Sequence, residues 1–255
     1  MEPSILTREN GAAIAYHHTP ARASSLQDQP GVIFCGGFKS DMTGVKATTL
    51  QTFCYGRGQQ YTRFDYQGHG ASSGDFVDGS IGEWRDDLLD VFDHVAQGPQ
   101  IVVGSSMGGW MALLLALARP ARVRGLVLVA PAADFTDALL WPSLSAGARR
   151  TIETEGVWLR PSLYDDGPYP ITRGLIEESR GHLVLGGPIP FTGPVRVLHG
   201  LEDETIPVEH VLKTANALTS RDVVVSLVKG GDHRLSSPAD LDRLCAAVFE
   251  LSGTA

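Results

Sequence analysis

The sequence predicts an α/β fold with a mostly parallel central sheet flanked by helices. Short apolar runs rich in Val, Ile and Leu alternate along the chain with longer stretches of helical periodicity. The runs lack the apolar–polar alternation of a strand with one wet face, so each is expected to be buried on both faces. Strand–helix alternation of this kind builds βαβ units. The predicted strands cover residues 31–35, 61–66, 100–103, 125–129, 195–198 and 223–228.

Two of the intervening segments carry clear helix signals. In residues 80–96 the apolar side chains fall on one helical stripe. Ser80 is a predicted N-cap, and Glu83 three residues later would complete a capping box. Residues 238–251 have the same character and are predicted to form the closing helix.

Length and charge limit the possible functions. The chain has 255 residues, enough for one large domain, and a formal net charge of −8. We therefore expect a single domain over residues 1–255. An acidic surface repels phosphate backbones and anionic lipid heads, so neither nucleic acid nor a membrane surface is an expected partner. No apolar run is long enough to cross a bilayer.

The first residues lack the basic and apolar regions of a secretory signal. Cys35, Cys54 and Cys245 fit no zinc pattern and no disulfide framework. We expect a cytoplasmic protein with reduced, mostly buried thiols. No cofactor or metal is expected, because no His or Cys cluster has metal spacing and no G-x-G-x-x-G opens a helix after the first strand.

Residues 134–192 depart from the strand–helix rhythm. They contain Trp141, Trp158 and many prolines, and no strand-like run. We expect helices and loops that cover the carboxyl edge of the sheet as a lid. The alternative is a surface excursion without a role.

Gly104-Ser105-Ser106-Met107-Gly108 has the pattern G-x-S-x-G between a predicted strand and a predicted helix. In that context the pattern is typical of a nucleophile elbow, a tight turn that exposes a serine above the sheet edge. The residues two before and two after the serine can carry almost no side chain, which Gly104 and Gly108 satisfy. Ser106 is the predicted nucleophile, and the alternative is a chance glycine–serine turn.

A serine hydroxyl needs a general base. His233 follows the predicted strand 223–228, so it lies in a loop at the same sheet edge as Ser106. His199 lies too close to its strand end to reach the serine, and His69 lies in a turn; both are expected to be structural. The remaining histidines are expected in helices or surface segments, at positions 17, 18, 94, 182 and 210.

A carboxylate must orient the imidazole and stabilise its positive form. The acidic triplet 202–204 follows the strand 195–198, and Asp134 follows the strand 125–129. Two backbone amides must also bind the oxyanion of an acyl-transfer intermediate. We expect the amides of Met107 and of Phe38, the latter in the glycine-rich loop after the first predicted strand. The alternative for this loop is an ordinary glycine turn.

Residues 64–72 resemble the D-x-x-G-H-G-x-S segment of the α/β-hydrolase superfamily, and the likeness extends over nearly the whole chain. The superfamily's usual acid, G-x-x-D before x-x-(Ile/Val)-Pro, corresponds to Asp203. This leaves Glu202 and Glu204 as solvated side chains and Asp134 as the alternative acid. More narrowly, the chain resembles the mitochondrial palmitoyl-protein thioesterases of animals that also cleave mycophenolic acid acyl glucuronide. The stretches that carry this likeness are 63–66, 84–87, 98–100, 104–106, 156–158 and 232–234.

The resemblance implies a serine hydrolase that cleaves carboxylic esters or thioesters, including S-acyl cysteine or acyl glucuronides. Its substrate would be a small molecule or an acylated protein. The mitochondrial location is not expected to carry over, because the N-terminus shows no Arg- and Ser-rich transit segment. Two alternatives stay open: C–C bond hydrolysis or perhydrolysis by the same residues, and a non-catalytic binding protein of this fold.

Overall fold

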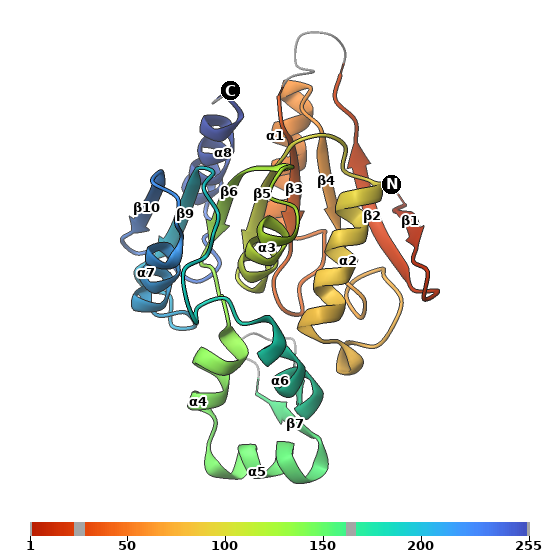
Figure 1. The fold of residues 1–255 in the computed structure, drawn as a ribbon, viewed down its shortest axis with the longest axis vertical. Coiled ribbons are helices and arrows are strands. Elements are labelled where there is room, and N and C mark those ends of the chain that lie inside the picture. The colour runs from red at the N-terminus through yellow and green to blue at the C-terminus, as the bar shows by residue number, and fades with distance from the viewer. Residues whose placement is uncertain (1, 23–28, 162–166, 254–255) are drawn as a thin grey trace.

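The computed structural model describes residues 2–22, 29–161 and 167–253. Its centre is an eight-stranded sheet in the order β1-β2-β4-β3-β5-β6-β9-β10 (Figure 1). All neighbouring strands from β4 to β10 are parallel, whereas β1 and β2 form an antiparallel edge. The strands are β1 (Ser4–Thr7), β2 (Ala13–Thr19), β3 (Gly31–Cys35), β4 (Tyr61–Phe64), β5 (Gln100–Ser105), β6 (Val123–Val129), β9 (Val195–Gly200) and β10 (Val223–Val228).

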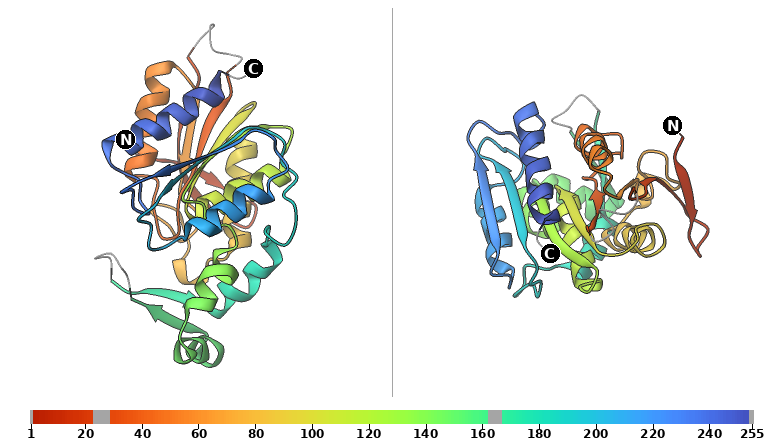
Figure 2. Two further views of the ribbon diagram at one scale, coloured as in Figure 1. Left: turned by 90° about the vertical axis from the view of Figure 1, so that its left-hand side faces the viewer. Right: turned by 90° about the horizontal axis from the view of Figure 1, so that it is seen from above.

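Helices cover both faces of the sheet (Figure 2). One face packs against α1 (Val45–Arg57) and α8 (Pro238–Ser252). The other packs against α2 (Ile81–His94), α3 (Met107–Ala118) and α7 (Val208–Ala217). Alternate residues of β3 enter the two cores, and the strands between β4 and β9 are buried throughout their length or nearly so. This arrangement explains the unbroken apolar runs of these strands. The expectation of burial on both faces is wrong for β10, an edge strand in which Val224 and Leu227 are exposed.

The strand predictions agree with the structure, apart from one or two residues at some ends. Helix α2 begins after Ser80, whose Oγ accepts a hydrogen bond from the Glu83 amide at 3.2 Å. The edge strands β1 and β2 were not predicted. Their sequences, SILT and AIAYHHT, mix polar and apolar side chains, because neither strand is buried along its whole length.

An excursion of the chain joins β6 to β9 and lies at the bottom of Figure 1. It packs around a small core of its own that includes Leu144 and Ile152. Its elements are a π-helical turn (Thr136–Leu140), α4 (Trp141–Ser143), α5 (Ala146–Glu155), β7 (Val157–Arg160), β8 (Tyr169–Thr172), α6 (Arg173–Ser179) and a 3-10 turn (Arg180–His182). Outside the excursion, a further 3-10 turn (Phe76–Asp78) lies between β4 and α2.

The prediction that residues 134–192 hold no strand is wrong, because β7 and β8 form an antiparallel pair. These two strands are short and lie apart from the main sheet, so neither shows a long continuous apolar run. Pro170 in β8 also argues against a strand at the level of sequence, because proline is rare within strands. Within the described ranges, no helix combines the length and the apolar character that crossing a membrane requires.

Candidate active site

Ser106 lies in a sharp turn between β5 and α3. Its backbone has φ 55° and ψ −120°, a conformation that strains any residue with a side chain. A Cβ on Gly104 would lie 2.2 Å from the Gly108 carbonyl oxygen, and a Cβ on Gly108 would lie 2.0 Å from the Cys35 carbonyl oxygen. Only glycine fits at either position, and the turn presents Ser106 to a pocket at the carboxyl edge of the sheet.

His233 reaches Ser106 from the loop after β10, with its Nε2 at 3.1 Å from Ser106 Oγ. Because β9 and β6 separate β10 from β5, this loop has to cross the end of β9. Gly200 permits the crossing: a Cβ there would lie 2.2 Å from the Gly231 carbonyl oxygen. In the sequence Gly200 is visible only as part of a family pattern, and its steric role follows only from the folded structure.

Asp203 follows β9, and its side chain is fully buried. Its Oδ2 accepts a hydrogen bond from His233 Nδ1 at 2.8 Å, and its Oδ1 accepts the amides of Thr205 and Ile206 at 2.8 and 2.9 Å. Burial alone would raise the pKa of this carboxyl group. The bond and charge of His233 and the two amides outweigh burial and hold the pKa of Asp203 below its ordinary value.

Asp134, the alternative acid, is engaged elsewhere. Its carboxylate accepts the amides of Val184 and Leu185, each at 2.8 Å, and its backbone has φ 55°. These bonds connect the first residues of the excursion to its returning segment. The side chain thus stabilises the excursion, and the structure joins Asp203 rather than Asp134 to the imidazole.

Three other histidines occupy buried positions: His69, His199 and His210. His199 is only 1% exposed, and its Nδ1 lies 3.7 Å from Asp203 Oδ2, beyond hydrogen-bond distance. His210 was expected in a helix or at the surface. It does lie in α7, but it is buried, and its Nε2 donates a hydrogen bond to the Ala133 carbonyl at 2.7 Å.

The two expected oxyanion donors lie close to the nucleophile. Met107 is the first residue of α3, so its amide has no carbonyl partner within the helix. Gly37 to Ser40 form a turn closed by a 3.1 Å bond from the Ser40 amide to the Gly37 carbonyl. A Cβ on Gly37 would lie 3.5 Å from Ser106 Cβ, so the turn runs directly beside the serine. Among the described residues, none accepts a hydrogen bond from the Phe38 amide.

A pocket of about 260 Å³ surrounds Ser106 and His233. Its apolar wall comes from the turn after β3, from the segment after β6 and from the excursion. The residues of this wall are Phe38, Phe135, Leu140, Tyr169 and Ile171. The Phe38 ring stands edge-on to those of Phe135 and Tyr169, at centroid distances of 5.5 and 5.9 Å.

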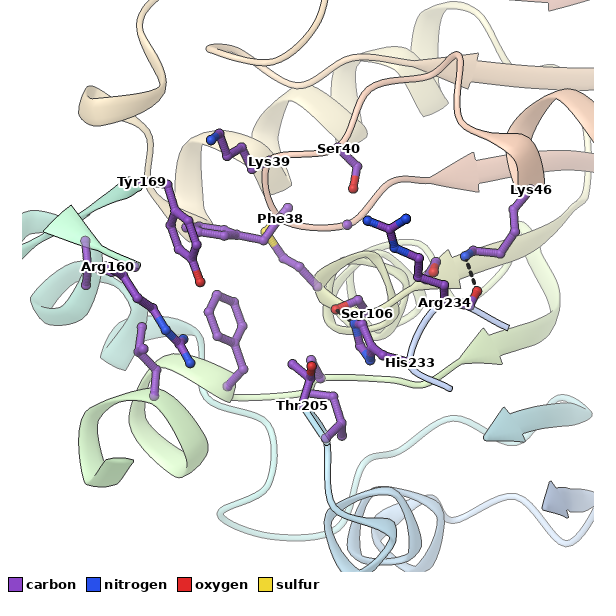
Figure 3. A pocket seen from close by; sticks show the side chains of 18 residues that line it. Phe38, Lys39, Ser40, Lys46, Ser106, Arg160, Tyr169, Thr205, His233 and Arg234 are labelled. Carbon is purple, nitrogen blue, oxygen red and sulfur yellow. Dashed lines mark hydrogen bonds between the residues drawn. The ribbon is translucent and has the colours of Figure 1, made fainter. Parts of the chain in front are cut away.

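Among the lining residues that the structure describes, the charged side chains other than His233 are cationic: Lys39, Lys46, Arg160 and Arg234. The charge of these side chains is opposite in sign to the net charge of the whole chain, which has 29 acidic and 21 basic residues. Figure 3 shows Lys46 and Arg234 on one side of Ser106 and Arg160 and Tyr169 on the other. Lys46 Nζ also donates to the Arg234 carbonyl at 2.5 Å. These cations were not predicted from the sequence, although Lys39 and Arg234 directly follow the predicted site residues Phe38 and His233 in the chain.

The three cysteines are free thiols. Burial raises the pKa of Cys35 and of Cys54 to about 12, so neither is a nucleophile near neutral pH. Cys245 is partly buried. In the part of the chain that the structure describes, no three His, Cys, Asp or Glu side chains are grouped so as to hold a metal ion.

A family model described as serine aminopeptidase, S33, matches residues 28–168. The mitochondrial palmitoyl-protein thioesterase ABHD10 of Mus musculus is 40% identical over 249 residues, which cover 97% of this chain and 82% of that protein. The chain belongs to the α/β-hydrolase family. The solved structures agree: a putative hydrolase from Agrobacterium vitis has a TM-score of 0.93 at 39% identity, covering 98% of both chains. The α/β-hydrolase domain-containing protein 10 from mouse has a TM-score of 0.89 at 39% identity over 98% of both chains.

Membership of the α/β-hydrolase family confirms the predicted fold class and the predicted enzyme class, a hydrolase of esters or thioesters. The prediction of a cytoplasmic location is wrong, because the relatives are named as mitochondrial proteins. That prediction relied on the lack of secretory-signal features and on cysteines without a disulfide pattern, and the mitochondrial location was set aside because no transit-segment pattern was found. A targeting segment acts before folding and contributes nothing to the folded domain, so the residues that build this fold carry no signal for location.

Proposed function

We propose that this α/β hydrolase cleaves acyl esters and thioesters through a covalent acyl-enzyme on Ser106, with His233 as general base and Asp203 as the orienting acid. The observation that supports this most directly is an unbroken chain of hydrogen bonds. It runs 3.1 Å from Ser106 Oγ to His233 Nε2 and 2.8 Å from His233 Nδ1 to Asp203 Oδ2. Both distances are within the range for general-base catalysis.

The reaction has two halves. As Ser106 Oγ attacks the acyl carbon, His233 accepts the hydroxyl proton and Asp203 stabilises the imidazolium. Collapse of the tetrahedral intermediate breaks the bond to the leaving group, which takes the proton from His233 and departs as an alcohol or thiol. Water then loses a proton to His233 and attacks the acyl-enzyme. The carboxylic acid leaves, and the same proton returns to Ser106.

The oxyanion of each tetrahedral intermediate accepts hydrogen bonds from the amides of Met107 and Phe38. The first amide lies at the N-terminus of α3, where the helix dipole favours negative charge. The second lies in the turn that passes beside Ser106. Loss of one such donor costs about 100- to 1,000-fold in rate.

We assign residues 134–192 the role of a lid on a single catalytic domain. The excursion contributes Leu140, Tyr169 and Ile171 to the apolar wall of the pocket, which suits the hydrocarbon part of an acyl group. Lys46 and Arg234, on the opposite side of Ser106, suit a polar or anionic leaving group.

S-acyl thioesters are the substrate class we propose, because relatives at 40% identity are named palmitoyl-protein thioesterases. Acyl glucuronides, which join an apolar acyl group to an anionic sugar acid, are the second class. C–C bond hydrolysis and perhydrolysis would use the same three side chains and differ in their products, so product analysis distinguishes them.

The test combines a fluorophosphonate probe with p-nitrophenyl esters and matched acyl thioesters of coenzyme A and of neutral N-acetylcysteamine. Wild-type protein should be labelled, and Ser106→Ala should not. Ser105→Ala, which removes the neighbouring hydroxyl, should be labelled normally. Labelling of Ser106→Ala at the wild-type rate would refute the nucleophile. The two thioesters compare an anionic with a neutral leaving group.

A further inference from the structure

The segment 65–72 has no part in the reaction described above, yet two of its side chains bind the loop between β3 and α1. Asp65 Oδ1 accepts the Met42 amide at 2.6 Å, and His69 Nε2 lies 3.1 Å from the Lys39 amide nitrogen. The Lys39 contact is one residue away from Phe38, the proposed oxyanion donor. The segment therefore holds the loop that carries this donor.

The backbone partners of His69 determine its tautomer. The Lys39 amide is a donor, so Nε2 must accept. The Gln67 carbonyl is an acceptor, so Nδ1, at 3.1 Å from it, must carry the proton. An imidazolium would place an N–H against the N–H of Lys39. Only the neutral Nδ1–H form satisfies both partners.

The ring of His69 is fixed in place by its surroundings. Edge-on contacts surround it, with centroid distances of 5.7 Å to Tyr66, 5.1 Å to Phe76 and 5.2 Å to Trp84. The side chain is only 4% exposed. Burial lowers the pKa of His69 below its ordinary value, which favours the neutral form. The ring of Phe38 packs against Phe76 and Trp84 as well.

The turn that His69 supports is strained. Lys39 has φ 59°, a left-handed conformation that is unfavourable for a non-glycine residue. In the turn closed by Gly37 and Ser40, the Lys39 amide points to His69, and the amide of Phe38 precedes it. An acceptor at Lys39 therefore stabilises the backbone geometry that directs the Phe38 amide.

We propose that His69 is a positioning residue for the oxyanion donor: as the neutral Nδ1–H tautomer it accepts the Lys39 amide and so fixes the turn that presents the Phe38 amide. This inference rests on the proposed function, because it takes Phe38 as a donor. His69 touches no reacting atom, and its effect reaches the reaction through the turn alone.

The test replaces His69 by Phe, which fills the aromatic site without an acceptor, and by Gln, whose Oε1 takes the place of Nε2 three bonds from Cβ. In His69→Phe, kcat for a p-nitrophenyl ester should fall about 10- to 100-fold, because small misplacements of catalytic groups cost up to that much. KM should change by less than about 3-fold, because uniform substrate binding is untouched. His69→Gln should recover kcat to within about 5-fold of wild type.

His18→Phe is the matched control, because it removes another imidazole hydrogen bond, to Thr62 Oγ1 at 2.9 Å, away from the pocket. It should keep the wild-type kcat. Equal losses in His69→Phe and His69→Gln would overturn the proposal, as would an unchanged kcat in folded His69→Phe. If Ser106→Ala kept its labelling, the proposed function would fail instead, so the two failures are distinguishable.

A measurement on the wild-type protein covers the case in which His69→Phe does not fold. Long-range ¹H–¹⁵N NMR spectra report which imidazole nitrogen carries a proton, and His69→Gln assigns the signal. Near neutral pH the spectrum should show the Nδ1–H tautomer. An Nε2–H tautomer or an imidazolium would contradict the assignment of Nε2 as acceptor.

Discussion

Asp203→Asn separates the charge of the proposed acid from its shape. The asparagine oxygen can keep the two bonds that Oδ1 accepts from the amides of Thr205 and Ile206. Its NH₂ group then faces His233 Nδ1, whose N–H donates a hydrogen bond to the carboxylate at 2.8 Å in the wild type. Two donors cannot share that contact, so Nδ1 becomes the acceptor and Nε2 carries the proton. In that tautomer His233 cannot accept the proton of Ser106.

The expected loss in kcat is about 10,000-fold, the size found when a wrong imidazole tautomer disables an otherwise intact site of this kind. At about 1.4 kcal/mol for each factor of ten, this corresponds to about 5.5 kcal/mol of transition-state stabilisation. The assay is steady-state hydrolysis of a p-nitrophenyl ester together with the rate of fluorophosphonate labelling. Both rates should fall together, and the melting temperature should change little.

Asp134→Asn is the matched control, because Asp134 is the alternative acid and also follows a strand at this edge. Asparagine tolerates the left-handed backbone at this position, where φ is 55°. The substitution weakens the bonds to Val184 and Leu185, so stability should fall while kcat stays within about 2-fold. A loss smaller than ten-fold in Asp203→Asn, or a larger loss in Asp134→Asn, would refute the assignment of the acid.

One further pair of substitutions tests the packing around the site, and a last one tests a buried carboxyl group in α2. In Gly200→Ala the new Cβ would lie 2.2 Å from the Gly231 carbonyl oxygen, so the loop of His233 must shift and kcat should fall about 100-fold. Gly147→Ala is the control: its new Cβ would have its nearest neighbour at 3.8 Å, and kcat in the same assay should not change. Burial raises the pKa of Asp87 to about 6, above its unfolded value of about 3.9. The folded protein therefore binds this proton more tightly, and the free energy of unfolding of the wild type should fall as the pH rises from 4 to 6. Urea titrations should show that the wild type loses up to about 3 kcal/mol more than Asp87→Asn over this range; equal slopes in the two proteins would contradict the raised pKa.

The elements that sequence predicts best are those whose signal is local. The elbow is an example for Gly104, because the atoms that exclude a side chain there belong to Gly108 and Gly109 in the same turn. The demand on Gly108 is not local, since it comes from Cys35 and Gly36 at the end of β3. The cap of α2 is another local signal, since Ser80 bonds an amide three residues away. The paired strands β7 and β8 were not predicted, because their burial depends on the small core of the excursion and no local sequence pattern indicates that core.

The geometry of the site depends on the spatial order of the strands in the sheet, which the sequence pattern does not predict. Strand ends predict that Ser106 and His233 lie at one edge of the sheet, but not that β6 and β9 stand between their strands. Three strand spacings amount to about 14 Å, too far for a side chain at the end of β10. The register that pairs Val228 with Gly200 aligns the ends of β10 and β9, and the missing side chain at Gly200 lets the next loop fold back over the sheet edge. Contact between the imidazole and the serine is thus a consequence of sheet order and of one glycine.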